Sequence, residues 1–386
     1  MKGVLIILLV MEGLLVFVHL AVYETVGAAF GAGSPIIGVI FIALAFTFVS
    51  ASLLARRYKN AFVRGYYRFA SYWFGLIHFL FIGALAFLFS AAVFYSFNYY
   101  VSPALIGAVA FGAFFMLHIY GTWESGRARV TDVAIALRGL PVAWQGKRIV
   151  FVSDLHLGNV RGKGFVKKIT AKINRLSPEA VFIGGDLYDG VACDAAALIE
   201  PLSALHVPQG VFFVTGNHEY YFPKGETAPA LAAIRAAGIR VLDNERVDLE
   251  GVALIGVDDA ASRLPQDLEN IMARLIPAGE RKERKAPNER RGEGPSPVIL
   301  LKHEPRGLAV AAAAGVSLML SGHTHHGQIF PIGYLTSVSY GGFDYGLKRF
   351  GGGEGMQVYI SSGAGTWGPP LRLGTRSEIV CITLTA

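Results

Sequence analysis

The sequence predicts an N-terminal bundle of four transmembrane helices followed by an α/β domain. Apolar residues make up 53% of the 386-residue chain and are concentrated before residue 124. From Lys147 onward, short apolar runs alternate with helical patterns, which is typical of a sheet covered by helices on both faces. We therefore expect a transmembrane domain over 1–124, a connector with a first strand over 125–146 and a globular domain over 147–386.

Four apolar runs are each long enough to cross a bilayer, whose core requires ~20 apolar residues per helix. They extend over 4–22, 36–54, 73–97 and 104–120. Tyrosine and tryptophan residues cluster at their ends, where an interfacial aromatic belt would lie. For the first run the alternative is a cleaved signal peptide, and the three runs that follow make this alternative the weaker one.

The basic residues predict how the bundle is oriented, because cytoplasmic loops carry an excess of Lys and Arg. One group lies between the second and third runs, and the others precede the first run and follow the fourth: Arg56, Arg57, Lys59, Arg64 and Arg68, then Lys2, then Arg127 and Arg129. All fall on one side of a four-span bundle. We expect a multi-pass protein of the inner (cytoplasmic) membrane with its globular domain in the cytoplasm.

The net charge of +7 and the two cysteines bear on partners and compartment. The basic residues are scattered or lie beside apolar runs, which favours contact with the phospholipid bilayer over nucleic acid. Cys193 and Cys381 are far apart and belong to no paired motif, which fits a reducing compartment.

Four ionisable residues fall inside the apolar runs: Glu12, His19, His78 and His118. An ionisable residue within a membrane span is a candidate for function. The more ordinary interpretation is a helix–helix hydrogen bond or a contact with lipid headgroups, and it is the one we favour for each.

Five predicted strands, 148–153, 180–185, 210–215, 298–302 and 317–321, end in residues that ligate metals. Ligand sites in α/β sheets lie at the carboxyl ends of strands, so these side chains are expected to converge. They are Asp154, His156, Asp186, Asn217, His303, His323 and His325. Mixed carboxylate and imidazole donors favour Mn²⁺, Zn²⁺, Fe or Co over Ca²⁺ or Mg²⁺.

Seven such ligands are too many for one ion that also keeps an open position. Two ions ~3.5–4 Å apart would use them all, with Asp186 as the shared carboxylate. Taken alone, His303 would more often be an ordinary buried histidine, and Asp186 could cap a helix. Together, five strand ends that all finish in ligands favour a metal centre.

These residues also carry a family resemblance. Asp154-Leu155-His156, Gly185-Asp186-Leu187-Tyr188-Asp189, Gly216-Asn217-His218-Glu219, His303 and Gly322-His323-Thr324-His325 resemble, in order, the five-part signature of calcineurin-like metallophosphoesterases. Residues 322–328 and 361–372 further resemble a membrane-associated bacterial branch that includes UDP-2,3-diacylglucosamine pyrophosphatases. His326 stands where glycine is expected in that branch.

The resemblance implies a four-layer α+β sandwich with two central β-sheets, and a role for each motif residue. One ion would be held by Asp154, His156, Asp186 and His325, and the other by Asp186, Asn217, His303 and His323. His218 would face the substrate and protonate the leaving oxygen or stabilise charge on the phosphoryl group, and Glu219 or Asp189 would orient it. Asn217 would also contact the substrate phosphate.

Three further segments are interpreted from the residues alone. Arg372 follows a glycine-rich turn and can hold a phosphate with two hydrogen bonds or form a surface ion pair. Asp258 and Asp259 follow another strand end and are either outer contacts of the metal ligands or capping residues. The charged segment 277–297 has no apolar periodicity, which predicts a disordered loop.

We therefore expect a membrane-anchored, metal-dependent hydrolase of a phosphodiester, phosphomonoester or pyrophosphate. The anchor favours a lipid-linked substrate, such as a UDP-diacylglucosamine-like molecule, because it holds the site near the bilayer. One alternative is the same chemistry on a soluble nucleotide or phosphoprotein. Another is a membrane sensor or transporter whose phosphoesterase-like domain binds without catalysis.

Overall fold

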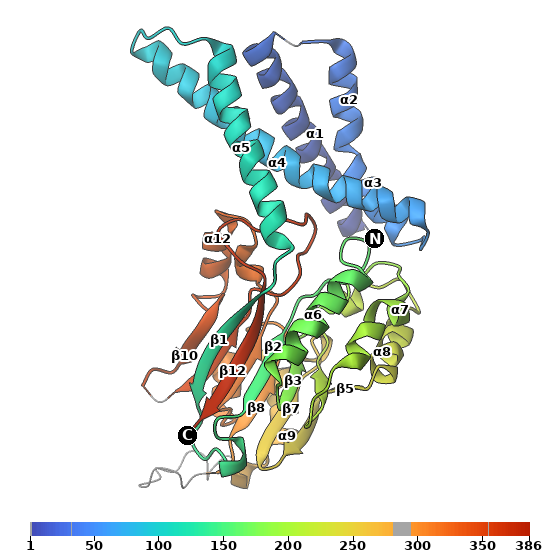
Figure 1. Cartoon of the computed structure of the whole chain (residues 1–386), viewed down its shortest axis with the longest axis vertical. Helices are drawn as coiled ribbons and strands as arrows, with labels where there is room; N and C mark the ends of the chain where they lie inside the picture. The colour runs from blue at the N-terminus through green and yellow to red at the C-terminus, as the bar shows by residue number, and fades with distance from the viewer. Residues whose placement is uncertain (1, 32, 281–294, 354) are drawn as a thin grey trace. The chain divides into compact units, whose positions relative to one another are not determined.

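The computed structural model of the chain describes residues 2–31, 33–280, 295–353 and 355–386 (Figure 1). The chain divides into two compact units. The membrane unit comprises Met1–Glu124 and Gly368–Leu373, and the globular unit comprises Ser125–Trp367 and Gly374–Ala386. The six residues Gly368–Leu373, which the sequence pattern groups with the globular domain, thus pack with the apolar helices.

The membrane unit consists of long apolar helices. Its elements are α1 (Lys2–Phe30), α2 (Pro35–Ala45), α3 (Thr47–Ala55), α4 (Ala61–Ser96) and α5 (Pro103–Ser125). Among the described residues, four stretches are long and apolar enough to cross a bilayer: Leu8–Phe30, Pro35–Ala55, Ala61–Ser96 and Pro103–Ser125. The prediction of four spans is therefore confirmed at the level of length and composition.

Helix α4 starts earlier than the apolar run that predicts it. The run begins at residue 73, whereas the helix begins at Ala61. The Asn60 side chain accepts a hydrogen bond from the Val63 backbone N–H at 2.9 Å and so caps the helix N-terminus. Arg64 and Arg68 are compatible with a helix, so part of the basic segment between the second and third runs is helical.

His19 shows how a polar side chain is satisfied inside the membrane unit. Its ring Nδ1 lies 2.7 Å from the Leu15 carbonyl oxygen, and Trp73 Nε1 donates to its Nε2 at 2.9 Å. His19 therefore links α1 to α4, which supports the helix–helix interpretation. Buried polar atoms of Glu12, His78 and His118 have no hydrogen-bond partner among the described residues, and their role stays a prediction.

The globular unit is built on two mixed sheets. Within the described residues the strand order of the first sheet is β1 (Arg129–Ala136), β12 (Glu378–Thr385), β2 (Arg148–Val152), β3 (Ala180–Ile183), β4 (Val211–Phe213) and β5 (Ile239–Val241). The order of the second is β10 (Gly346–Phe350), β11 (Met356–Ile360), β9 (Leu318–Ser321), β8 (Val298–Leu301), β7 (Val252–Gly256) and β6 (Glu245–Leu249). The two-sheet prediction is confirmed, and the strand in the connector is β1, which lies at an edge of the first sheet.

Helices cover the outer faces of both sheets, which gives four layers. Helices α6 (Lys163–Leu176), α7 (Ala195–Ile199) and α8 (Thr227–Ala236) lie over the first sheet (Figure 1). Helices α9 (Pro265–Leu275) and α11 (Leu308–Ala313) pack on the second. Side chains from both sheets, including Phe151 and Leu254, form a shared core between them. The predicted four-layer sandwich is therefore confirmed.

The remaining elements are short. They are α12 (Ile332–Ser339) and the 3₁₀ turns η1 (Val142–Trp144), η2 (Glu200–Ala204), η3 (His218–Tyr220), η4 (Ala260–Ser262) and η5 (His325–Gly327). The expected disordered loop at 277–297 falls mostly on 281–294, outside the described residues.

Strand register brings the ends of the predicted strands together. In the first sheet β2, β3 and β4 are parallel, with Val152 opposite Ile183 and Ile183 opposite Phe213. In the second sheet β8 and β9 are parallel, with Leu301 opposite Leu320. The chain segments that leave these carboxyl ends carry all of the predicted ligands, so the site is a product of sheet register.

Candidate metal centre

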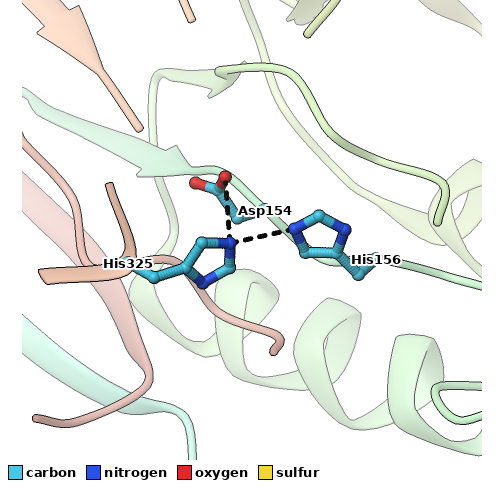
Figure 2. A group of neighbouring side chains, drawn as sticks. All are labelled: Asp154, His156 and His325. Carbon is cyan, nitrogen blue, oxygen red and sulfur yellow. Dashed lines mark hydrogen bonds and ion pairs between the residues drawn. The ribbon is translucent and has the colours of Figure 1, made fainter. Parts of the chain in front are cut away.

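The first ligand group comes from the loops after β2 and β9. Figure 2 shows Asp154, His156 and His325 converging from these loops. His156 Nε2 lies 3.0 Å from His325 Nε2, and His325 Nε2 lies 3.5 Å from Asp154 Oδ1. Two imidazole nitrogens and a carboxylate thus face one point.

The second group comes from the loops after β3, β4, β8 and β9. Asp186 Oδ2 lies 3.2 Å from His303 Nε2, which in turn lies 3.2 Å from His323 Nδ1. Asn217 Oδ1 lies 2.8 Å from the same His323 nitrogen. Asp186, His303 and His323 each offer a ligand atom to a common point, and Asn217 adds a neutral oxygen.

Asp186 connects the two groups. Its Oδ2 is 3.2 Å from His303 Nε2 and 3.8 Å from His156 Nε2, which belong to different groups. His303 Nε2 is also 4.0 Å from Asp154 Oδ1. The structure therefore brings all seven predicted ligands into one cluster, with the predicted shared carboxylate between the groups.

The charged groups of the cluster are compatible with the binding of cations. Burial raises the pKa of Asp154. Burial alone would lower the pKa of His303, but the nearby Asp186 carboxylate outweighs it and raises that pKa to about 10. Burial would raise the pKa of Asp186, and the His303 charge reverses this and lowers it. The cluster thus places carboxylates against imidazoles, and these are donor types that bind divalent cations with release of protons.

The ligand loops adopt backbone conformations that are unusual for residues with side chains. The φ angles of Asp154, His156, Asp186, His323 and His325 are 54°, 47°, 49°, 70° and 49°. Each lies in the left-handed region, where a side chain costs free energy. Such residues concentrate at functional sites whose surroundings hold the strain.

Two glycines make room for the carboxylates. A Cβ at Gly322 would collide with Asp154 Oδ2 and lie 2.5 Å from Ser153 Oγ. A Cβ at Gly216 would collide with Asp186 Oδ1 and lie 2.6 Å from the Asp186 backbone nitrogen. Only glycine fits at these two positions, so these motif glycines are needed for Asp154 and Asp186 to take the positions they have.

His218 lies beside the cluster. Its backbone N–H donates to Asp186 Oδ1 at 2.9 Å, and its ring meets the His156 ring at a centroid distance of 4.6 Å. Its Nδ1 is 3.2 Å from the Asp189 carbonyl oxygen and 3.9 Å from Asp189 Oδ1. Burial and the neighbouring His156 lower the pKa of His218.

Asp189 and Glu219 take different positions around that imidazole. Asp189 contacts the His218 ring, and its Oδ1 also lies 3.5 Å from His156 Nδ1, so it can orient a ligand as well. Glu219 is fully buried and accepts the backbone N–H groups of Asp186, Tyr188 and Gly216 at 3.0, 3.1 and 2.7 Å. Of the two residues expected to orient His218, the geometry assigns that contact to Asp189, while Glu219 holds the backbone around Asp186.

His326 has a left-handed backbone conformation, which is more usual for glycine. Its φ and ψ are 49° and 38°. Its Nδ1 pairs with Asp344 Oδ2 at 3.0 Å, and its ring stacks on Tyr345 at a centroid distance of 4.6 Å. His326 therefore makes polar and aromatic contacts at the position where the resemblance leads us to expect glycine.

Asp258 and Arg372 lie in different parts of the structure. Asp258 accepts hydrogen bonds from Thr215 Oγ1 at 2.7 Å and the Ala261 N–H at 2.8 Å, and also from the Tyr220 hydroxyl, which favours the capping interpretation. Arg372 is fully buried in the membrane unit, where its N–H donates to the Gly121 carbonyl at 2.9 Å. Its contact with a substrate phosphate stays a prediction.

Known proteins share these motifs. Residues 147–327 match the model of the calcineurin-like phosphoesterase family. A transmembrane protein with metallophosphoesterase domain from Danio rerio is 34% identical over 278 residues, which cover 70% of this chain and 60% of that protein. An uncharacterized metallophosphoesterase from Helicobacter pylori is 32% identical, covering 79% and 80%. One from Aquifex aeolicus is 34% identical, covering 70% of this chain and 96% of the relative.

The fold and the ligand cluster define a metallophosphoesterase domain on a chain with apolar helices. The chain belongs to the calcineurin-like metallophosphoesterase family. Membership indicates a metal-dependent phosphoester hydrolase. The similarity to the Danio rerio protein covers only 60% of that protein's length. It therefore does not indicate that the two proteins share a substrate.

Proposed function

We propose that this protein is a membrane-anchored hydrolase that binds two divalent metal ions and cleaves a phosphodiester, phosphomonoester or pyrophosphate of a lipid-linked substrate. The observation that supports the proposal is the convergence of the seven predicted ligands into one cluster that includes Asp186, with His218 beside it. A UDP-2,3-diacylglucosamine-like molecule combines a pyrophosphate with acyl chains and is the substrate type that we propose.

The proposed ligand sets follow the two groups in the cluster. Asp154, His156, Asp186 and His325 would hold one ion, and Asp186, Asn217, His303 and His323 would hold the other. Bound ions would activate a water molecule near neutral pH and stabilise negative charge on the phosphoryl oxygens. The mixture of imidazole and carboxylate donors favours Mn²⁺, Zn²⁺, Fe or Co.

The protein's own side chains would contact the substrate and supply a proton. With Nδ1 of His218 against the Asp189 carbonyl oxygen, Nε2 is the nitrogen left to meet the substrate. In the charged form, this nitrogen can hold a proton for the leaving oxygen, and Asn217 can contact the phosphoryl group. Glu219 keeps the backbone around Asp186 in place through its three accepted hydrogen bonds.

A substrate panel tests the proposal. The full chain, purified in detergent with Mn²⁺, is assayed on UDP-2,3-diacylglucosamine, a water-soluble nucleotide, a phosphopeptide, bis(4-nitrophenyl) phosphate and 4-nitrophenyl phosphate. We expect kcat/KM for the lipid pyrophosphate to exceed that for the soluble esters by about tenfold or more, because remote binding energy raises kcat/KM.

Other outcomes of the panel point to the alternatives. Faster turnover of the nucleotide or phosphopeptide would contradict the lipid-linked substrate and favour a soluble one. No turnover of any ester, together with a cellular function that survives Asp186→Asn, would favour a sensor or transporter with a binding domain.

We also propose that the globular unit lies in the cytoplasm of a cell with an inner membrane. Cys193 is partly exposed in this unit and Cys381 is buried, so labelling of the intact protein should report on Cys193. We expect a membrane-impermeant maleimide to label it only after the cells are opened, with Cys193→Ser as the control. Labelling in intact cells that is lost in Cys193→Ser would place the unit outside.

A further inference from the structure

We propose that Trp367 and Tyr221 form an aromatic subsite beside His218 that binds a planar ring carried by the substrate near its phosphoryl group. The inference rests on the proposed hydrolase function, because it assigns the ring to a phosphate-containing substrate. Neither residue belongs to the motifs that supply the metal ligands.

Two exposed rings border a buried imidazole at this position. His218 is 7% exposed, whereas Tyr221 is 46% and Trp367 is 59% exposed. The Tyr221 ring lies 4.9 Å from the His218 ring between centroids at an interplanar angle of 58°. The Trp367 ring lies 6.2 Å from it at 77°. The neighbours of the His218 ring therefore include two exposed aromatic residues.

Trp367 is held in place although its ring is exposed. The Gln328 side chain donates from Nε2 to the Trp367 carbonyl oxygen at 2.9 Å, and its Oε1 accepts from the Trp367 N–H at 2.9 Å. The Gln328 carbonyl oxygen accepts from Thr375 Oγ1 at 2.8 Å. Gln328 follows the ligand His325 by three residues, so the loop that carries a metal ligand also fixes the Trp367 backbone.

Tyr221 is also held in place beside the His218 imidazole. Its backbone N–H donates to the His218 carbonyl oxygen at 3.0 Å. A Cβ at Gly190 would lie 2.7 Å from Tyr221 Cβ and 2.8 Å from the His218 carbonyl oxygen. The turn that carries Asp189, the residue against the His218 ring, is therefore packed closely on Tyr221.

This arrangement suits a planar ring. Large aromatic side chains are usually buried away from water when a protein folds. Two of them that stay exposed beside His218 contribute little to packing in the free protein. Because both backbones are anchored, little conformational freedom is lost when a ligand stacks on the rings. Aromatic stacking on a protein side chain changes affinity by roughly tenfold or more per ring, and an alkyl group lacks the flat face that stacking needs.

The test uses three non-hydrolysable ligands that share one anionic group. Phenylphosphonate, cyclohexylphosphonate and methylphosphonate are titrated by calorimetry into the full chain, loaded with Mn²⁺ in detergent. We expect phenylphosphonate to bind about tenfold tighter than the other two. Trp367→Leu should remove most of this preference and leave the affinity for methylphosphonate unchanged, whereas Trp367→Phe should retain it.

Tyr334→Leu is the matched control, because Tyr334 is another exposed aromatic residue, 70% exposed, of the globular unit. It should leave all three affinities unchanged. Equal binding of phenyl and methyl ligands by the unaltered protein would overturn the proposal, as would equal weakening of both by Trp367→Leu. If cyclohexylphosphonate bound as tightly as phenylphosphonate, the two side chains would form a general apolar surface, and the planar-ring subsite would be contradicted.

The failure of this inference is distinguishable from failure of the proposed function. If the hydrolase proposal is wrong, the substrate panel shows no turnover of any ester, whatever the ligands bind. If only the subsite is wrong, turnover is present and the phosphonates show no preference for the phenyl ring.

Discussion

Replacement of Asp186 by asparagine is expected to lower kcat on the order of a thousandfold or more. The Asp186 carboxylate lies between the two ligand groups, 3.2 Å from His303 and 3.8 Å from His156. Its loss removes the one anionic ligand that both groups share. Asparagine keeps an oxygen that can still accept the His218 N–H, so we expect the fold to be retained.

The measurement is steady-state hydrolysis of bis(4-nitrophenyl) phosphate together with a thermal melt. Asp243→Asn serves as the control, because it makes the same chemical change at an exposed position of the globular unit. Activity of Asp186→Asn within tenfold of the unaltered protein, at an unchanged melting temperature, would contradict the shared role of this carboxylate.

Replacement of His218 by glutamine is expected to lower kcat by about 10²–10⁴, the range typical of a lost general acid or base. Metal content should stay unchanged, because His218 lies beside the ligand groups and contacts Asp186 through its backbone N–H. The loss should be larger for an ester with an alkyl leaving group than for one with 4-nitrophenolate. A good leaving group departs without a proton.

The measurement compares kcat on alkyl and 4-nitrophenyl esters for the altered and unaltered proteins, with metal content determined in parallel. His206→Gln is the matched control, since His206 is an exposed histidine of the same unit. Equal loss on both esters would argue against proton transfer by His218, and a loss of metal would make it a ligand.

Much of the globular unit could be predicted because its central strands are short apolar runs. Strands β2, β3 and β8 are buried along their whole length or nearly so, and each ends where a ligand loop begins. Burial on both faces excludes polar residues until the strand ends, so the first polar residues mark the functional edge. The same logic predicts that Asp186, which follows β3, lies at this edge of the sheet.

Other parts could not be predicted from local patterns. Strands β6 and β10 lie at the edges of the second sheet. They contain exposed or partly exposed residues, such as Lys348 and Arg246, and form no continuous apolar run. The pairing of Gln328 with Trp367 joins residues 39 positions apart, which no sequence periodicity encodes. The left-handed backbone of the ligand residues is equally a tertiary effect.

The proposed function requires one cluster to hold two ions, so metal stoichiometry is the decisive measurement. The full chain is purified in detergent, incubated in turn with Mn²⁺, Zn²⁺, Fe²⁺ and Co²⁺, desalted and analysed by mass spectrometry for metal per chain. We expect two ions per chain for at least one of these metals, and fewer in Asp186→Asn. Retention of one ion or none with every metal, or equal content in the Asp186→Asn variant, would contradict a two-ion centre at Asp186.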